Sequence, residues 1–116
     1  MPASRSNQCN KMLQIIIKNK FQGTKTHWYW VRVYSLFGEN ENSNWLISST
    51  IRRLILNKHI NLTPCNQRFN YLYIRDFVKQ INLIIDQPNN YSGIYNVCSS
   101  KSIKLKTLLI KTAELI

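Results

Sequence analysis

A polar stretch at residues 63–76 holds the side chains of this chain that are best suited to bind a ligand. A turn containing Pro64 opens it, and the residues around Tyr71 and Tyr73 alternate as in a strand. Amide, guanidinium and phenol groups are offered by Gln67, Arg68, Asn70 and Tyr71. These residues form our candidate substrate patch. The alternative is that they hold the turn and the strand together.

Other arrangements that could carry chemistry are absent from the sequence. The two histidines and three cysteines show no metal-ligand spacing, so no metal site is predicted; they are His27, His59, Cys9, Cys65 and Cys98. Asp76 is expected to cap a helix rather than to act as a catalytic acid. Few cysteines and a start without an apolar run suggest a reducing, cytoplasmic setting. No segment approaches the roughly 20 apolar residues that span a bilayer.

The charge of the chain restricts its partners. Sixteen Lys and Arg against five Asp and Glu give a formal net charge of +11. Such an excess favours nucleic acid, an acidic membrane surface or phosphate-bearing small molecules. A drifted composition is the alternative, because the basic residues are dispersed along the chain. A hydrophobic content of 44% indicates a folded protein of one domain, or part of one.

The elements that must position the polar stretch alternate between helices and strands. Apolar periodicity and breakers predict helices over 6–20, 45–57, 76–87 and 103–116, with Asn44 capping the second and Pro88 ending the third. Extended segments are predicted over 28–34, 60–63, 69–74 and 94–97. Bulky residues on both faces of 28–34 suggest a strand buried between helices, with Arg32 as an unexplained charge. The buried helix faces are predicted to include Phe77, Ile81, Ile84 and Ile85, and then Leu105, Leu108, Leu109 and Thr112. This alternation indicates an α/β chain.

Three motifs in order give the chain a family resemblance. Arg32 to Glu39 resembles an Arg-hydrophobic-Phe-x-x-Tyr-Gly-Pro stretch, with Phe37 replacing tyrosine and Glu39 replacing proline. Residues 67–76 resemble Gln-x-x-Asp-Tyr/Phe-x-Tyr-Val-x-Asp, and residues 93–102 are similar to Gly-x-Tyr-Asn-Ile-Gly-Ser-Gly. Together they resemble the extended short-chain dehydrogenase/reductase family of NAD(P)-dependent nucleotide-sugar epimerases, dehydratases and reductases.

Two features of that family are missing from these residues. The glycines Gly23, Gly38 and Gly93 are too scattered for a Gly-x-Gly-x-x-Gly loop that would hold a dinucleotide. The family's catalytic tyrosine and lysine fall on Ser6 and Asn10, or on Asn7 and Lys11 in a shifted register, so no tyrosine is recovered. We therefore predict no catalytic residue and no binding of NAD or NADP by this chain alone.

The resemblance implies a fold, a division of the chain into two parts and a class of substrate. The fold is the C-terminal portion of a Rossmann-like NAD(P)-binding fold with its small substrate-binding subdomain, without the dinucleotide-binding half. Residues 1–38 would be the last helix and strand of the Rossmann part, and 39–116 mostly the substrate-binding part. A nucleotide sugar would contact the candidate patch together with Ser35, Asn44 and Trp45. Asn44 and Trp45 are also interpreted as a cap and a hydrophobic anchor.

The predicted function is thus a truncated epimerase, dehydratase or reductase that is inactive alone. Its expected partners are a missing N-terminal half or further copies of the chain, and no membrane. A small basic nucleic-acid-binding module is the less favoured alternative; it would use Lys and Arg interleaved with Trp28, Tyr29, Trp30, Tyr71 and Tyr73.

Overall fold

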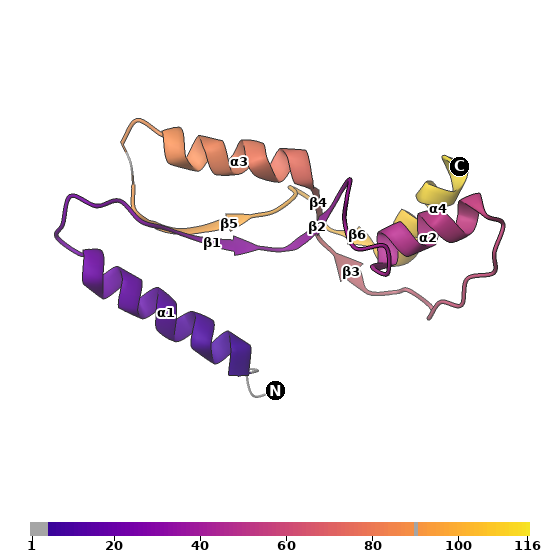
Figure 1. The fold of residues 1–116 in the computed structure, drawn as a ribbon, viewed down its shortest axis with the longest axis horizontal. Helices are drawn as coiled ribbons and strands as arrows, with labels where there is room; N and C mark the ends of the chain where they lie inside the picture. The colour runs from indigo at the N-terminus through magenta and orange to yellow at the C-terminus, as the bar shows by residue number, and fades with distance from the viewer. Residues whose placement is uncertain (1–4, 90) are drawn as a thin grey trace. The chain divides into compact units, whose positions relative to one another are not determined.

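The computed structural model describes residues 5–89 and 91–116, which divide into two packing units. The first unit comprises residues 5–32, 82–89 and 91–96, and the second comprises residues 33–81 and 97–116. The elements are labelled in Figure 1. No helix in the described part of the chain is long and apolar enough to cross a membrane.

The first unit contains α1 (Arg5–Phe21), most of β1 (Tyr29–Val33), the end of α3 (Ile74–Asp86) and most of β5 (Gly93–Val97). β1 and β5 pair as a two-stranded sheet, and the rings of Tyr29 and Tyr95 lie 5.9 Å apart. α1 ends two residues before Gly23, whose φ of 75° suits glycine. Its apolar residues Met12 and Ile16 are 63% and 55% exposed.

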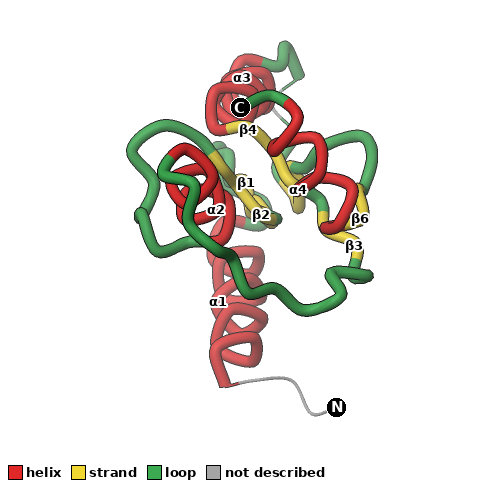
Figure 2. The backbone as a smooth tube through the Cα atoms, turned by 90° about the vertical axis from the view of Figure 1, so that its right-hand side faces the viewer, coloured by secondary structure: helices red, strands yellow, loops and turns green. Residues whose placement is uncertain are grey.

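The second unit contains two further strand pairs, two whole helices and the first part of α3 (Figure 1). β2 (Ser35–Phe37) runs parallel to β4 (Tyr71–Tyr73), and β3 (Arg68–Phe69) runs antiparallel to β6 (Ile103–Lys104). α2 (Leu46–Ile55) packs against α4 (Leu105–Glu114). Figure 2 shows β3 beside β6 where α4 begins.

The core of the second unit forms where α4 meets the turn before β3. Cys65, Leu105 and Leu109 are buried together, and partly buried neighbours pack on them: Leu46, Tyr71 and Leu108. The amides of Leu105 and Lys106 donate to the carbonyls of Gln67 and Cys65. The start of α4 is therefore tied to the polar stretch by backbone hydrogen bonds as well as by apolar burial. The predicted burial of Leu105 and Leu109 is confirmed.

α2 ends in a Schellman motif centred on Asn57. The amide of Lys58 donates to the carbonyl of Arg53, the amide of Asn57 donates to that of Leu54, and Asn57 has a φ of 52°. Asparagine tolerates this left-handed conformation better than most residues. The end of α2 thus follows from one residue type at one position.

Several predicted details are wrong. Asn44 does not cap α2, because Trp45 occupies the N-cap position without a side-chain cap bond. Asp76 does not cap α3 either, since the helix begins at Ile74 and Asp76 lies inside its first turn, where its charge still suits the helix dipole. Ile85 is 52% exposed, and α3 has no fully buried residue. Arg32 and Val33 are exposed, so β1 is not buried on both faces.

The strands also differ from the predicted ones. β2 and β6 were missed, residues 58–67 form no strand, and the predicted strand over 69–74 divides at Asn70 into β3 and β4. Elements of two or three residues are too short to show an apolar period, so their position depends on the partners that tertiary structure supplies.

Truncation of the core residue Leu109 tests this packing. Leu109→Ala should lower the free energy of unfolding by about 2–5 kcal/mol, because it leaves a cavity under α4. The matched change Leu115→Ala, at a side chain that is 88% exposed, should cost about 0.5 kcal/mol or less. Urea denaturation measures both. Equal losses would mean that α4 does not pack as described.

Candidate functional site

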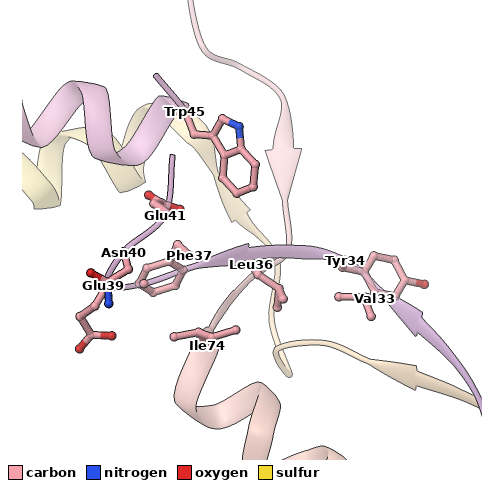
Figure 3. Close-up of a pocket in the computed structure, with 10 residues that line it drawn as sticks. Val33, Tyr34, Leu36, Phe37, Glu39, Asn40, Glu41, Trp45 and Ile74 are labelled. Carbon is pink, nitrogen blue, oxygen red and sulfur yellow. The ribbon is translucent and has the colours of Figure 1, made fainter. Parts of the chain in front are cut away.

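A largely apolar cavity lies where the parallel strands β2 and β4 end. Its volume is about 450 Å³, and it is drawn in Figure 3. The lining consists of Val33, Tyr34, Leu36, Phe37, Gly38, Glu39, Asn40, Glu41, Trp45 and Ile74. Phe37 ends β2, and Ile74 directly follows β4. The cavity extends along β2 from Val33 and Tyr34 to the loop that follows the strand. Ligands of open α/β sheets bind outside the carboxyl ends of parallel strands, where that loop lies.

The loop that follows β2 forms one wall of the cavity, and Gly38 lets it approach α3. A Cβ atom at Gly38 would lie 2.4 Å from Cγ2 of Ile74. Any larger residue would therefore displace either the loop or the first turn of α3. In Figure 3, Phe37 and Ile74 lie close together beneath the loop that carries Glu41.

Two glutamates fasten this loop to neighbouring elements. The hydroxyl of Tyr73 donates to Oε1 of Glu39 at 2.5 Å, and Nη2 of Arg75 lies 3.3 Å from the same oxygen. The hydroxyl of Ser48 donates to the carboxylate of Glu41. The loop between β2 and α2 is thus held at two points, one on β4 and α3 and one on α2.

The hydrogen bond between Glu39 and Tyr73 sets their ionisation. It holds the pKa of Glu39 below its ordinary value of 4.5, helped by a backbone hydrogen bond and by Arg75. The same hydrogen bond raises the pKa of Tyr73. Desolvation, followed by the charge of Glu41, raises the pKa of Tyr71. The lining of the cavity contains these two glutamates and no basic side chain, and the guanidinium of Arg75 lies against Glu39.

Of the sequence-predicted site residues, only Trp45 lines this cavity. Its indole is 58% exposed and stands over the cavity in Figure 3. Asn44 is exposed, and its amide donates to Oδ1 of Asn42 at 2.9 Å, so Asn42 rather than Asn44 organises the turn before α2. Ser35 is the register partner of Tyr71 in the β2–β4 pair. Residues from two separate motifs are therefore adjacent on neighbouring strands.

Asn70 and Arg68 bind the backbone that follows β5. Oδ1 of Asn70 accepts from the amide of Ser99 at 2.7 Å, and its Nδ2 donates to the carbonyls of Ser99 and Lys101 at 2.8 and 3.5 Å. Arg68 donates through Nε and Nη2 to Oγ and the carbonyl of Ser102 at 3.1 and 2.9 Å. Both residues therefore hold residues 99–102 in place.

The remaining predicted residues are not part of the lining of the cavity. Gln67 is exposed and contributes its backbone carbonyl to the start of α4. Ser6 and Asn10 lie in α1, in the first packing unit. Within the described residues, no three His, Cys, Asp or Glu side chains are grouped as metal ligands.

Sequence reasoning missed Glu39, Glu41 and Ile74. One signal was available for the glutamates, because two of the five acidic residues of a basic chain flank Asn40 directly after Gly38. Ile74 had no such signal, since its contact with the loop depends on how β4 pairs with β2.

Nicotinamide dinucleotides do not fit the residues present. The three glycines lie in separate parts of the chain, after α1, after β2 and at the start of β5, and Gly23 and Gly93 have nothing within 4 Å of an added Cβ. A loop that cradles a pyrophosphate needs several glycines at the start of one helix. These 116 residues contain no such loop.

The fold is that of an α/β chain of the Rossmann-like type, with a cavity beside β2 and the start of α3. The sequence model of the NAD dependent epimerase/dehydratase family matches residues 8–98. The chain therefore belongs to that family, as the motifs suggested.

Solved structures of three enzymes have the same fold over this chain. UDP-N-acetylglucosamine 4-epimerase from Methanobrevibacter ruminantium, in complex with UDP-N-acetylmuramic acid, superposes with a TM-score of 0.80 at 17% identity, covering 95% of this chain and 36% of that one. dTDP-glucose 4,6-dehydratase from Bacillus anthracis, in complex with NAD, superposes with a TM-score of 0.81 at 13% identity. The match covers 99% of this chain and 37% of that one. UDP-glucose 4-epimerase from Thermotoga maritima, with UDP-glucose, superposes with a TM-score of 0.80 at 12% identity. The match covers 99% of this chain and 38% of that one.

The chain thus spans a little over a third of the length of these enzymes. No curated protein sequence matches it. The expected fold class, the C-terminal portion of a Rossmann-like epimerase/dehydratase fold, is confirmed.

The clamp formed by Asn70 generates a prediction at a family motif position. Asn70→Asp keeps the acceptor for Ser99 but loses the donor to two carbonyls, and should lower the free energy of unfolding by about 1–3 kcal/mol at pH 7. The loss should shrink at low pH, where a protonated carboxyl can donate again. Asn61→Asp, at an exposed residue outside helices and strands, is the control. Equal urea midpoints for the two variants would refute the clamp.

The fastening of the loop generates a pH prediction. Because the pKa of folded Glu39 is lowered, its contact stabilises the protein above pH 4.5 and is lost as the pH falls through the folded-state pKa. Tyr73→Phe should move the pKa of Glu39 back towards 4.5, as measured by NMR titration of its carboxyl carbon. Tyr34→Phe, which changes another tyrosine of the same region, is the control. An unaltered Glu39 pKa in Tyr73→Phe would show that the hydrogen bond does not form.

Proposed function

We propose that this chain is the substrate-side portion of a nucleotide-sugar epimerase, dehydratase or reductase. In this proposal residues 1–38 supply the last helix and strand of the Rossmann part, and residues 39–116 supply most of the substrate-binding part. The observation that carries the proposal is the cavity at the carboxyl ends of β2 and β4, in a chain of this family. UDP-sugar ligands in two of the similar enzymes support the substrate class.

The lining of the cavity suits a sugar better than a phosphate. Trp45 offers an exposed aromatic face, and carbohydrate rings present C–H groups that pack on such faces. Glu39 and Glu41 are acceptors for hydroxyl groups and would repel a phosphate at the same place. The diphosphate of a nucleotide sugar would therefore have to lie outside the cavity.

The chain by itself is expected to bind without catalysing. Hydride exchange in the family uses NAD(P), and these residues offer neither the glycine loop nor the tyrosine and lysine that the motif comparison places at Ser6 and Asn10. Serine does not ionise near neutral pH, and asparagine carries no charge that would help it. A polypeptide supplying the cofactor half, or further copies of this chain, is the proposed partner.

The nucleic-acid alternative has no specific observation in its favour. Tyr71 contacts the rings of Phe37 and Phe69, and Tyr73 contacts Phe37. Tyr29 contacts Tyr95. Packing therefore accounts for these aromatic residues, and base stacking is not needed to explain them.

Calorimetry on the full 116-residue chain tests the proposal with UDP-, dTDP-, GDP- and CDP-sugars, NAD and NADP. A nucleotide sugar should bind, and Trp45→Ala should weaken it by about threefold to tenfold through the loss of one aromatic contact. Trp28→Ala, in the other packing unit, should change that affinity little. No sugar conversion is expected with NAD or NADP added. Binding of either dinucleotide at micromolar concentrations, or no binding of any nucleotide sugar, would contradict the proposal.

A further inference from the structure

The loop that joins α2 to β3 lines another apolar groove of the second packing unit. This groove has a volume of about 420 Å³, and the helices α2 and α4 form its other walls (Figure 1). The helices contribute Leu54, Ile110 and Ala113, and the loop contributes Ile60, Leu62 and residues 63–65. Asn61 is not part of the lining, so from Ile60 to Leu62 alternate side chains face the groove. This is the pattern of one face of a strand.

The backbone of this loop has unpaired hydrogen-bonding groups beside the groove. Among the described residues, none makes a hydrogen bond to the amides or carbonyls of residues 60–63. The chain from residue 58 to residue 67 contains no helix, turn or bend, so residues 60–63 follow an extended path. An extended segment with unpaired donors and acceptors is a template on which another strand can pair.

Both ends of the unpaired segment are fixed to helices. Nη1 of Arg53 in α2 donates to the carbonyl of His59 at 3.1 Å, and the amide of Lys106 in α4 donates to the carbonyl of Cys65 at 2.9 Å. Cys65 is also buried in the core of this unit. Because the segment is held on both sides, little of its conformational freedom remains to be lost when a strand pairs with it.

The charge around the groove favours an acidic occupant over a second copy of the chain. Among the described residues that line the groove, Lys106 is the one that carries a charge, and Lys58 precedes the unpaired segment. Glu114 follows the lining residue Ala113 on α4. The formal net charge of +11 makes two copies repel each other, whereas it attracts an acidic polypeptide.

We propose that residues 60–63 form a docking edge for an extended polypeptide segment in which apolar and acidic residues alternate. The backbone of the partner adds a strand beside the unpaired segment. Its apolar side chains enter the groove next to Leu62, and its acidic side chains face the solvent in the positive field of the chain. This inference goes beyond the proposed function, which names a partner polypeptide but no surface that would hold it.

A capped heptapeptide in which glutamate and valine alternate tests the docking edge on the full 116-residue chain. Calorimetry should give a Kd below about 1 mM. NMR should show slower hydrogen exchange at alternate amides, either those of Ile60 and Leu62 or those of Asn61 and Thr63, because successive amides of a strand point to opposite edges. A heptapeptide with lysine in place of glutamate should bind about tenfold more weakly or less.

N-methylation of the heptapeptide separates an added strand from contact through side chains alone. Methylating all valine amides blocks one edge of the peptide, and methylating all glutamate amides blocks the other. One methylated peptide should lose about tenfold or more in affinity, because its hydrogen bonds to residues 60–63 cannot form. The other should stay within about threefold of the parent peptide. Equal loss or equal retention in the two peptides would overturn the added strand.

Leu62→Ala tests the groove itself. This side chain is 46% exposed in the free chain and becomes covered in the complex, so the variant should weaken heptapeptide binding by about threefold to tenfold. Leu83→Ala is the matched control, at a side chain that is 72% exposed on α3, and should leave the affinity within about twofold. Equal weakening by both variants, or unchanged affinity in folded Leu62→Ala, would contradict the proposal.

Analytical ultracentrifugation distinguishes the other possible occupant of the groove. Dimerisation of the free chain that Leu62→Ala abolishes would assign the edge to a second copy and overturn the acidic partner. Absence of heptapeptide binding at about 1 mM would overturn it as well. Neither outcome concerns nucleotide-sugar binding, so failure of the docking edge and failure of the proposed function are distinguishable.

Discussion

The parallel pairing of β2 with β4 is the interaction on which the rest of the second packing unit depends. It aligns Ser35, Leu36 and Phe37 with Tyr71, Leu72 and Tyr73. Leu72 is 5% exposed at the centre of this pair. The pairing also ends both strands at the same level, which places the loop after β2 beside the first turn of α3. Because the two strands end side by side, Glu39 reaches Tyr73 and Gly38 approaches Ile74. The cavity forms beside these contacts.

Charge is distributed unevenly in the second packing unit, and this divides what its surfaces can bind. The two glutamates of the cavity are fixed by hydroxyl donors and by Arg75, and the pKa of Glu39 is lowered. Arg68 and Lys104 are register partners in β3 and β6, and no carboxylate among the described residues forms an ion pair with them.

Much of the fold could be predicted because long elements carry their own signals. α1 and α4 lie where apolar periodicity predicted helices. The short strands β2 and β6 could not be predicted, since their existence depends on partners distant in sequence. Helix starts were misplaced for a related reason. Asn44 and Asp76 have the residue types of a cap, but Asn42 organises one turn and β4 runs directly into the other helix.

The candidate site was harder to predict, because residue type indicates polarity but not its use. The sequence suggested that Arg68 and Asn70 bind a ligand, but both side chains form hydrogen bonds with residues 99–102. Asn70 shows why the motif position matters. The family pattern has an aspartate there, and a carboxylate could accept from Ser99 but could not donate to the carbonyls of Ser99 and Lys101. The amide satisfies both kinds of partner at once. The replacement of aspartate is thus matched by the backbone around it, so a departure from the family motif here reflects a structural contact of this chain rather than a simple loss.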